Sequence, residues 1–280
     1  MDPLPFPADS SFTFRNLPGG DSFPLASVYM AVAYSQYIAA VVRPLVPSTP
    51  SLDMTLYLTD YSGYAGPTDL QPGLDMHGFL FPRSVTNPNY VLIWLMEGLL
   101  DHLRPFKNSI EGHSYHLTSL YQRFQVVGKV DRVYSKEVLK PLPSLDGVDI
   151  SFSSQAQPLD IPDAILAAQK IFKRVTVEEL EAVVPKHWRF SSGSVSFTFI
   201  TPPWLRPRTM TWAELGRGAM AMIDFMRKHG EEGKFKEVRA EIQRRNAAGN
   251  FETVGLADVT VNANSGGADP PVEVPEYETA

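Results

Sequence analysis

The sequence predicts an α+β protein made of two tandem copies of a β-α-β-α-β-β unit, packed as an intramolecular pseudo-dimer. One observation is a repeated opening, in which Phe14 and Phe152 stand at the same offset as Pro24 and Pro162. Another is that strand and helix patterns follow in the same order in both halves. One unit with two helices would leave an apolar surface uncovered, and a second copy would bury it.

The first copy is expected to span residues 1–134. Its predicted elements are a strand at 11–14, a helix after Pro24, a strand at 54–58, a helix at 89–103 and closing strands at 115–124 and 126–133. Pro24 suits a first helical turn, where a missing N–H costs nothing. The uncharged run 25–42 is about long enough to span a membrane. Its tyrosines, serines and glutamine instead favour a helix buried inside the protein.

The second copy is expected to span residues 147–264. Its predicted elements are a strand at 150–153, a helix after Pro162, a strand at 195–199, a helix at 211–228 and closing strands at 235–244 and 253–261. Thr211 and Glu214 have the spacing of a capping box. The polar residues of the helix after Pro162 suggest that it is half-exposed. Both final strands begin Val-Gly, at Val127 and Val254, where a glycine suggests a bulge or a close backbone approach.

Two segments fall outside the copies. Residues 135–146 contain two prolines and read as a linker. Residues 265–280 are rich in glycine, proline and glutamate, which predicts a disordered tail.

Composition limits the function classes. The chain has 280 residues, a net charge of −6 and no cysteine. Thiolate nucleophiles and cysteine-ligated metals are excluded, and an acidic chain is a poor general nucleic-acid binder. No basic segment followed by an apolar run opens the sequence, so a cytoplasmic protein without a membrane span is expected, as a monomer or homodimer.

No common catalytic motif is present, and neither a cofactor nor a metal is expected. The chain lacks GxSxG, GxxxxGK[ST], GxGxxG and HExxH. His113 and His116 have a metal-like spacing, but an odd separation on a strand places them on opposite faces.

The largest difference between the copies is the connection between the central strand and the second helix. In the first copy it is a predicted loop from 59 to 88, whose length suggests a lid or a site lining. From it we select His77 and Tyr61 as catalytic candidates, and Tyr64 and Phe79 as substrate-binding candidates.

The shorter counterpart in the second copy holds Trp204 and Arg206 among three prolines. Arg206 is a catalytic candidate and Trp204 a substrate-binding candidate, because Trp and Arg on a stiff loop suit a flat or anionic ligand. Trp188, just before the central strand, is a further substrate-binding candidate. The alternative is that the tryptophans are packing residues and the arginine is solvated.

Two motifs carry a resemblance. The helix opening Thr211-Trp212-Ala213-Glu214-Leu215 and the Val254-Gly255…Val259 strand resemble a fungal family of largely unassigned function. In size and character the chain also resembles the cofactor-free hetero-Diels–Alderases of fungal tropolone–sesquiterpenoid biosynthesis. That resemblance implies secondary-metabolite chemistry of an isomerase or lyase type, and it assigns no catalytic residue.

The leading hypothesis is therefore a cofactor-independent cyclase, a pericyclase of the hetero-Diels–Alder type, acting on an apolar unsaturated small molecule held between the copies. Cycloaddition needs orientation and a few hydrogen-bond donors rather than a nucleophile. A non-enzymatic interaction or effector-like protein is the alternative. A hydrolase or isomerase with a dispersed acid–base pair is a third.

Overall fold

The computed structural model describes residues 11–17, 22–42, 51–57, 71–80, 88–103, 109–111, 114–121, 124–135, 145–185, 187–205, 209–229 and 235–262. Helices and antiparallel sheets make up these residues, which confirms the α+β class. The chain divides into two compact units, β1 to β7 and β8 to β14, here called the N-terminal and C-terminal units. The predicted linker lies mostly outside the described residues, and the predicted tail lies wholly outside them.

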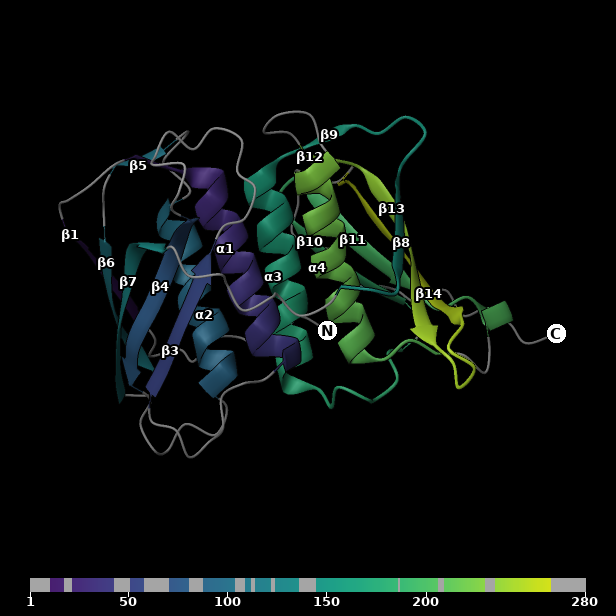
Figure 1. Cartoon of the computed structure of the whole chain (residues 1–280), viewed down its shortest axis with the longest axis horizontal. Helices are drawn as coiled ribbons and strands as arrows, with labels where there is room; N and C mark the ends of the chain where they lie inside the picture. The colour runs from purple at the N-terminus through teal and green to yellow at the C-terminus, as the bar shows by residue number, and fades with distance from the viewer. Residues whose placement is uncertain are drawn as a thin grey trace. The chain divides into compact units, whose positions relative to one another are not determined.

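The N-terminal unit is a five-stranded sheet with two helices (Figure 1). The strand order is β1-β6-β7-β4-β3, and a short β2–β5 pair lies apart from this sheet. Helix α1 contacts β3, β4 and α2, and α2 also contacts β1. The elements are β1 (Ser11–Leu17), β2 (Ser22–Pro24), α1 (Leu25–Tyr37), the π-helix η1 (Ile38–Val42), β3 (Ser51–Tyr57), β4 (Gln71–Leu80), α2 (Pro88–Leu103), β5 (Ser109–Glu111), β6 (Ser114–Tyr121) and β7 (Phe124–Ser135).

The C-terminal unit is also a five-stranded sheet with two helices (Figure 1). The strand order is β10-β11-β14-β13-β8, and a short β9–β12 pair lies apart from this sheet. Helix α4 contacts β13 and β8. The elements are β8 (Val148–Phe152), β9 (Pro158–Leu159), α3 (Ile161–Val177), β10 (His187–Ser192), β11 (Val195–Ile200), the 3₁₀-helix η2 (Pro203–Leu205), α4 (Trp212–His229), β12 (Phe235–Lys236), β13 (Val238–Arg245) and β14 (Phe251–Val261).

The number of strands between the two helices of each unit was predicted wrongly. The N-terminal unit has β3 and β4 there, and the C-terminal unit has β10 and β11. The order of the main elements is therefore β-α-β-β-α-β-β. The predicted loop 59–88 is wrong over β4, because this strand pairs with both β3 and β7. Its sequence, QPGLDMHGFL, contains a proline, two glycines and an aspartate, which are depleted in strands, and the ladders on both sides override that preference.

The Val-Gly pairs lie at irregularities of pairing, as predicted. In the C-terminal unit Ile242 pairs with Gly255 and Gln243 with Thr253, so Val254 is the extra residue of a bulge. A Cβ on Gly255 would lie 3.0 Å from Met210 Sδ, which also makes this position a close approach. In the N-terminal unit the register between β4 and β7 shifts after the pair of His77 with Lys129.

Both helices that open the units are largely buried. The residues described in α1 are buried, including Ser35 and Gln36, as expected for the uncharged run. Within the described residues, no helix combines the length and the apolarity needed to cross a bilayer. The expectation that α3 is half-exposed was wrong, because Gln169, Lys173 and Thr176 are also buried. These three lie at helical spacing along one polar face of α3.

Candidate functional site

The most concentrated set of aromatic and charged side chains in the C-terminal unit lies at the edge strand β10. Trp188 stacks on Phe190 of the same strand, with ring centroids 5.6 Å apart. It meets Trp212, the first residue of α4, edge to face at 5.2 Å. Arg174, from the last turn of α3, places its guanidinium carbon 5.2 Å from the ring centre of Trp188 and 5.5 Å from that of Trp212. We call these four residues the Trp–Arg cluster.

Ring faces and one carboxylate hold the guanidinium of Arg174. Cation–π contacts of this kind stabilise a partly desolvated arginine. Glu178, one turn further along the chain, forms an ion pair with Nη2 of Arg174. The arginine is thus fixed by its neighbours in a position beside the two indoles.

Two N–H groups of the cluster are buried without a hydrogen-bond partner. They are Nε of Arg174 and Nε1 of Trp188, and neither has an acceptor among the residues that the structure describes. Buried donors are almost always paired in native proteins, so unpaired ones call for an explanation. A carbonyl or carboxylate oxygen beside the rings would accept from these donors.

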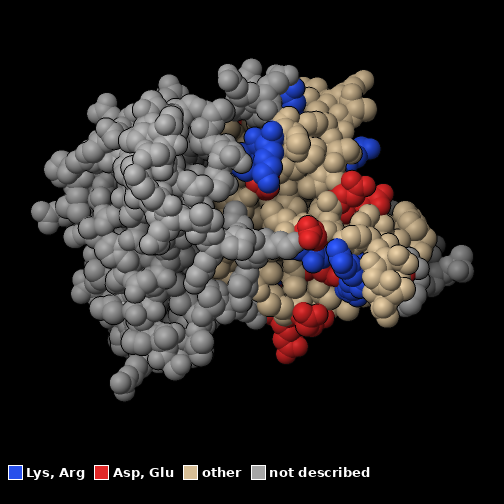
Figure 2. Space-filling model, viewed as in Figure 1, with Lys and Arg blue, Asp and Glu red and all other residues tan. Residues whose placement is uncertain are grey.

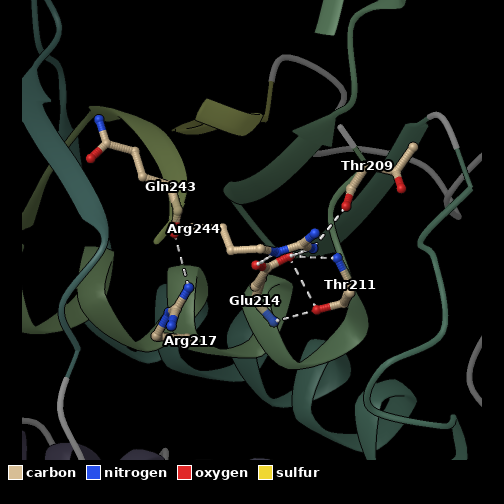
Figure 3. A network of polar contacts seen from close by, with 6 residues as sticks. All are labelled: Thr209, Thr211, Glu214, Arg217, Gln243 and Arg244. Atoms are coloured by element: carbon tan, nitrogen blue, oxygen red, sulfur yellow. Dashed lines mark hydrogen bonds and ion pairs between the residues drawn. The ribbon is translucent and has the colours of Figure 1, made fainter. Parts of the chain in front are cut away.

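A second network of hydrogen bonds lies at the start of α4, the helix that Trp212 opens, and Figure 3 shows its Thr211, Glu214 and Arg244. The Thr211 amide and hydroxyl both donate to Oε2 of Glu214, at 2.8 and 3.1 Å. The Glu214 amide donates to Oγ1 of Thr211 at 3.4 Å, which completes the predicted capping box. Arg244 of β13 then donates to both carboxylate oxygens of Glu214, at 2.6 Å each, and to the carbonyl of Thr209 at 2.9 Å. Trp212, which lies within this capping box, is therefore anchored to the sheet through Arg244.

The network controls the charge of Glu214. Burial alone would raise the pKa of this carboxyl, but the hydrogen bonds from Arg244 and Thr211 hold the pKa below its usual range. The hydrogen bonds to Glu214 likewise raise the pKa of Arg244. The ion pair therefore persists over the whole neutral range.

The residues of β10 beside Trp188 belong to a separate polar group. Arg189 donates to Ser196 Oγ at 3.3 and 3.1 Å and to Asn262 Oδ1 at 3.1 Å. Partial burial of the imidazole and the neighbouring Arg189 lower the pKa of His187. Because side chains alternate along a strand, His187 and Arg189 lie on the face opposite to Trp188.

The candidates chosen from the sequence separate into three groups. Trp188 belongs to the Trp–Arg cluster. Trp204 lies on η2, is 77% exposed and makes no ring contact with the cluster residues within the described structure. His77 and Phe79 lie on β4 rather than on a loop, but the structure describes only their backbone and not their side chains. Tyr61, Tyr64 and Arg206 lie outside the described residues.

Sequence reasoning did not select Arg174 or Trp212 as site residues. Trp212 was visible as the second residue of the capping motif. Arg174 stands twelve residues after Pro162, and only the folding of the chain between α3 and β10 brings it beside Trp188.

The visible surface of the described residues carries both charge signs. Figure 2 shows Lys and Arg side chains interspersed with Asp and Glu, without one continuous basic area. Comparison with models of known families, with curated proteins and with solved structures gives no match to this chain.

Proposed function

We propose that the protein is a cofactor-independent cyclase of the hetero-Diels–Alder type, which binds an apolar conjugated carbonyl compound at the Trp–Arg cluster. The observation that carries the proposal is the pair of buried, unpartnered donors, Arg174 Nε and Trp188 Nε1, beside two indole rings. The rings provide flat apolar walls, and the donors meet a carbonyl oxygen.

These groups suffice for the chemistry. In a hetero-Diels–Alder reaction an enone and an alkene form one C–C and one C–O bond, and no atom is lost or gained. Hydrogen bonds to the enone oxygen withdraw electron density and stabilise the charge that develops there in the transition state. Holding both reactants against the rings supplies orientation.

The test uses benzylideneacetone, a conjugated ketone, with ethyl vinyl ether as the alkene partner. We expect the full chain to accelerate formation of the dihydropyran over the uncatalysed rate. Trp188→Phe, which keeps a ring and removes the N–H, should lower that acceleration about tenfold or more. Arg174→Gln should lower it further, because it also removes the charge.

The matched control is Trp204→Phe, the same substitution at an exposed tryptophan outside the cluster. It should leave the rate unchanged. Binding is checked separately with 1-phenyl-1-butene, which has the same carbon skeleton without the carbonyl and should quench tryptophan fluorescence less. No acceleration by the wild-type chain, or equal rates in all variants, would refute the proposal.

The two units have matching topologies. Matching β1 through β7 with β8 through β14 gives the same strand order in both main sheets and the same short pairs. We infer that the units are duplicated copies packed as an intramolecular pseudo-dimer. Separately expressed units that associate with each other would support this inference, and units that stay monomeric when mixed would contradict it.

One observation favours a non-enzymatic interaction protein as the second candidate. Trp204 is 77% exposed on η2, and such a residue is a common anchor of protein interfaces. If Trp204→Ala abolishes a biological effect of the chain while Trp188→Phe has none, this second candidate is correct.

A further inference from the structure

Arg189 lies on the sheet face opposite to Trp188, and uncharged groups hold its guanidinium there. Its Nε and Nη2 donate to Ser196 Oγ at 3.3 and 3.1 Å, and Nη2 also donates to Asn262 Oδ1 at 3.1 Å. Ser196 is 0% exposed and Asn262 is 9% exposed. The Asn262 side chain is itself fixed, because its Nδ2 donates to the Gly193 carbonyl at 3.3 Å. The guanidinium is therefore oriented before any ligand arrives.

The charge of Arg189 has no counter-charge within the described part of the chain. Three other arginines of this unit are each paired with a carboxylate: Arg227, Arg239 and Arg244. Arg189 makes hydrogen bonds to a hydroxyl and an amide and forms no ion pair with a described residue. Thr198 stands directly opposite it on β11, and Asp258, the next residue across the sheet, is paired with Arg239. An exposed, oriented guanidinium without a carboxylate is suited to bind an anion.

Further donors lie next to Arg189 on the same face. A guanidinium has five N–H groups, and the two on Nη1 of Arg189 make no hydrogen bond within the described structure. His187 is exposed and lies two residues earlier on β10, so its side chain is on this face too. Partial burial and the charge of Arg189 lower the pKa of His187, so the two groups interact. The Thr198 hydroxyl is on the same face because cross-strand partners share a face.

We propose that His187, Arg189 and Thr198 form a binding site for a phosphate group. Nη1 of Arg189 donates to one phosphate oxygen, and the imidazole and the Thr198 hydroxyl donate to the others. A phosphate monoester has nearly two negative charges at neutral pH and three acceptor oxygens, which suits three separate donors better than a carboxylate does. The site is independent of the proposed cyclase function, because it lies on the opposite face of β10 and shares no residue with the Trp–Arg cluster.

The first test is an NMR titration of the full chain with inorganic phosphate at pH 7, at constant ionic strength set with chloride. We expect saturable binding. Arg189→Gln should weaken it roughly tenfold or more, because a hydrogen bond to a charged group is lost. Thr198→Val, which keeps the shape of the side chain and removes the hydroxyl, should weaken it roughly fivefold.

The matched control is Arg239→Gln, the same substitution at an arginine on the same sheet face. Arg239 is 74% exposed and already paired with Asp258, so phosphate affinity should change by less than about twofold. Methyl phosphate and acetate are titrated in parallel. Tighter binding of methyl phosphate would assign the site to a phosphomonoester, and tighter binding of inorganic phosphate would assign it to the free ion. Both results support a phosphate site, whereas acetate binding as tightly as phosphate would overturn it.

The second test follows the imidazole of His187 by NMR with sulfate, a tetrahedral dianion that keeps its charge throughout the titration. On β11 the uncharged Ile200 stands opposite His187, so Arg189 supplies the charge that acts on this imidazole within the described residues. A bound dianion stabilises the imidazolium, so saturating sulfate should raise the pKa of His187 by roughly 0.5 or more. Chloride at the same ionic strength should raise it less.

Urea unfolding checks that the variants fold, and the wild-type chain alone can refute the proposal. It is overturned if phosphate does not bind saturably to the wild-type chain, or if sulfate and chloride change the pKa of His187 equally. It is also overturned if Arg239→Gln weakens binding as much as Arg189→Gln, since the effect would then come from net charge. If Arg189→Gln does not fold, Thr198→Val decides, and an unchanged phosphate affinity in that variant would overturn the proposal.

Discussion

Replacing Arg244 by leucine removes the residue that joins β13 to the start of α4. In the wild-type chain Arg244 makes two charge-assisted hydrogen bonds with Glu214, whose side chain is only 8% exposed. The substitution leaves this carboxylate buried with the Thr211 donors alone. We expect a less stable C-terminal unit and a looser position for Trp212.

The magnitude follows from exposure. A hydrogen bond to a charged group contributes about 1.5–3 kcal/mol. Arg244 is itself 45% exposed, so solvent screens its interaction with Glu214. The two hydrogen bonds therefore contribute less than they would in a fully buried pair. We therefore expect Arg244→Leu to lower the free energy of unfolding by about 2 kcal/mol in total at neutral pH.

The control lies on the same strand. Arg239 pairs with Asp258 at 3.3 Å, but Arg239 is 74% exposed. Burial raises the pKa of Asp258 despite Arg239, so this pair does not offset the desolvation of its carboxylate. Arg239→Leu should therefore change the free energy of unfolding by less than about 1 kcal/mol.

The assay is urea unfolding followed by tryptophan fluorescence, since three of the four tryptophans (Trp188, Trp204 and Trp212) lie in this unit. The pKa of Glu214 is lowered on folding from 4.5, so the contribution of its ion pair is complete above about pH 4.5 and is lost as the pH falls through the folded-state pKa. Arg244→Leu should accordingly lower the free energy of unfolding by less at acid pH than at pH 7. The reasoning would be refuted if Arg244→Leu lowered the free energy of unfolding equally in a Glu214→Gln background, or did not lower it at pH 7.

Two further predictions concern the C-terminal unit. Gly193 has φ of +49°, and a Cβ there would lie within 2.5 Å of three Asp163 carboxyl atoms, so Gly193→Ala should cost roughly 3 kcal/mol in urea unfolding. Gly249 has φ of +83° with open space around it, so Gly249→Ala should cost only about 1 kcal/mol, and equal costs would contradict the steric argument. His187 should titrate below 6.5 by NMR, and Arg189→Gln should raise its pKa; a midpoint above 6.5 would contradict this assignment. Because folding lowers this pKa, His187 makes the fold less stable as the pH falls through the unfolded value.

The sequence allowed good prediction where the signal is local. The capping box at Thr211 and Glu214 and the bulge at Val254 each follow from a few neighbouring residues. Strand β4 could not be found in this way. Its residues have poor strand propensity, and pairing with β3 and β7, far along the chain, decides their conformation.

The site was harder to predict for a related reason. Trp188 could be selected as an aromatic residue near a strand, but its partner Arg174 looked like one of several polar residues on a half-exposed helix. The burial of Gln169 and Lys173 beside it shows that residue type alone does not reveal which helix faces are covered. Only tertiary packing brings the guanidinium to the indoles.

Asp163 makes the turn between β10 and β11 part of the opening of α3. Its Oδ2 accepts from the Ser194 amide at 2.7 Å and from the Ser194 hydroxyl at 2.9 Å, and its own amide donates to Asp160. The turn therefore cannot detach unless the first turn of the helix also loses an anchor. Amide hydrogen exchange at Ser194 should thus be slow for a hairpin tip and should rise together with exchange at the start of α3, as one opening event.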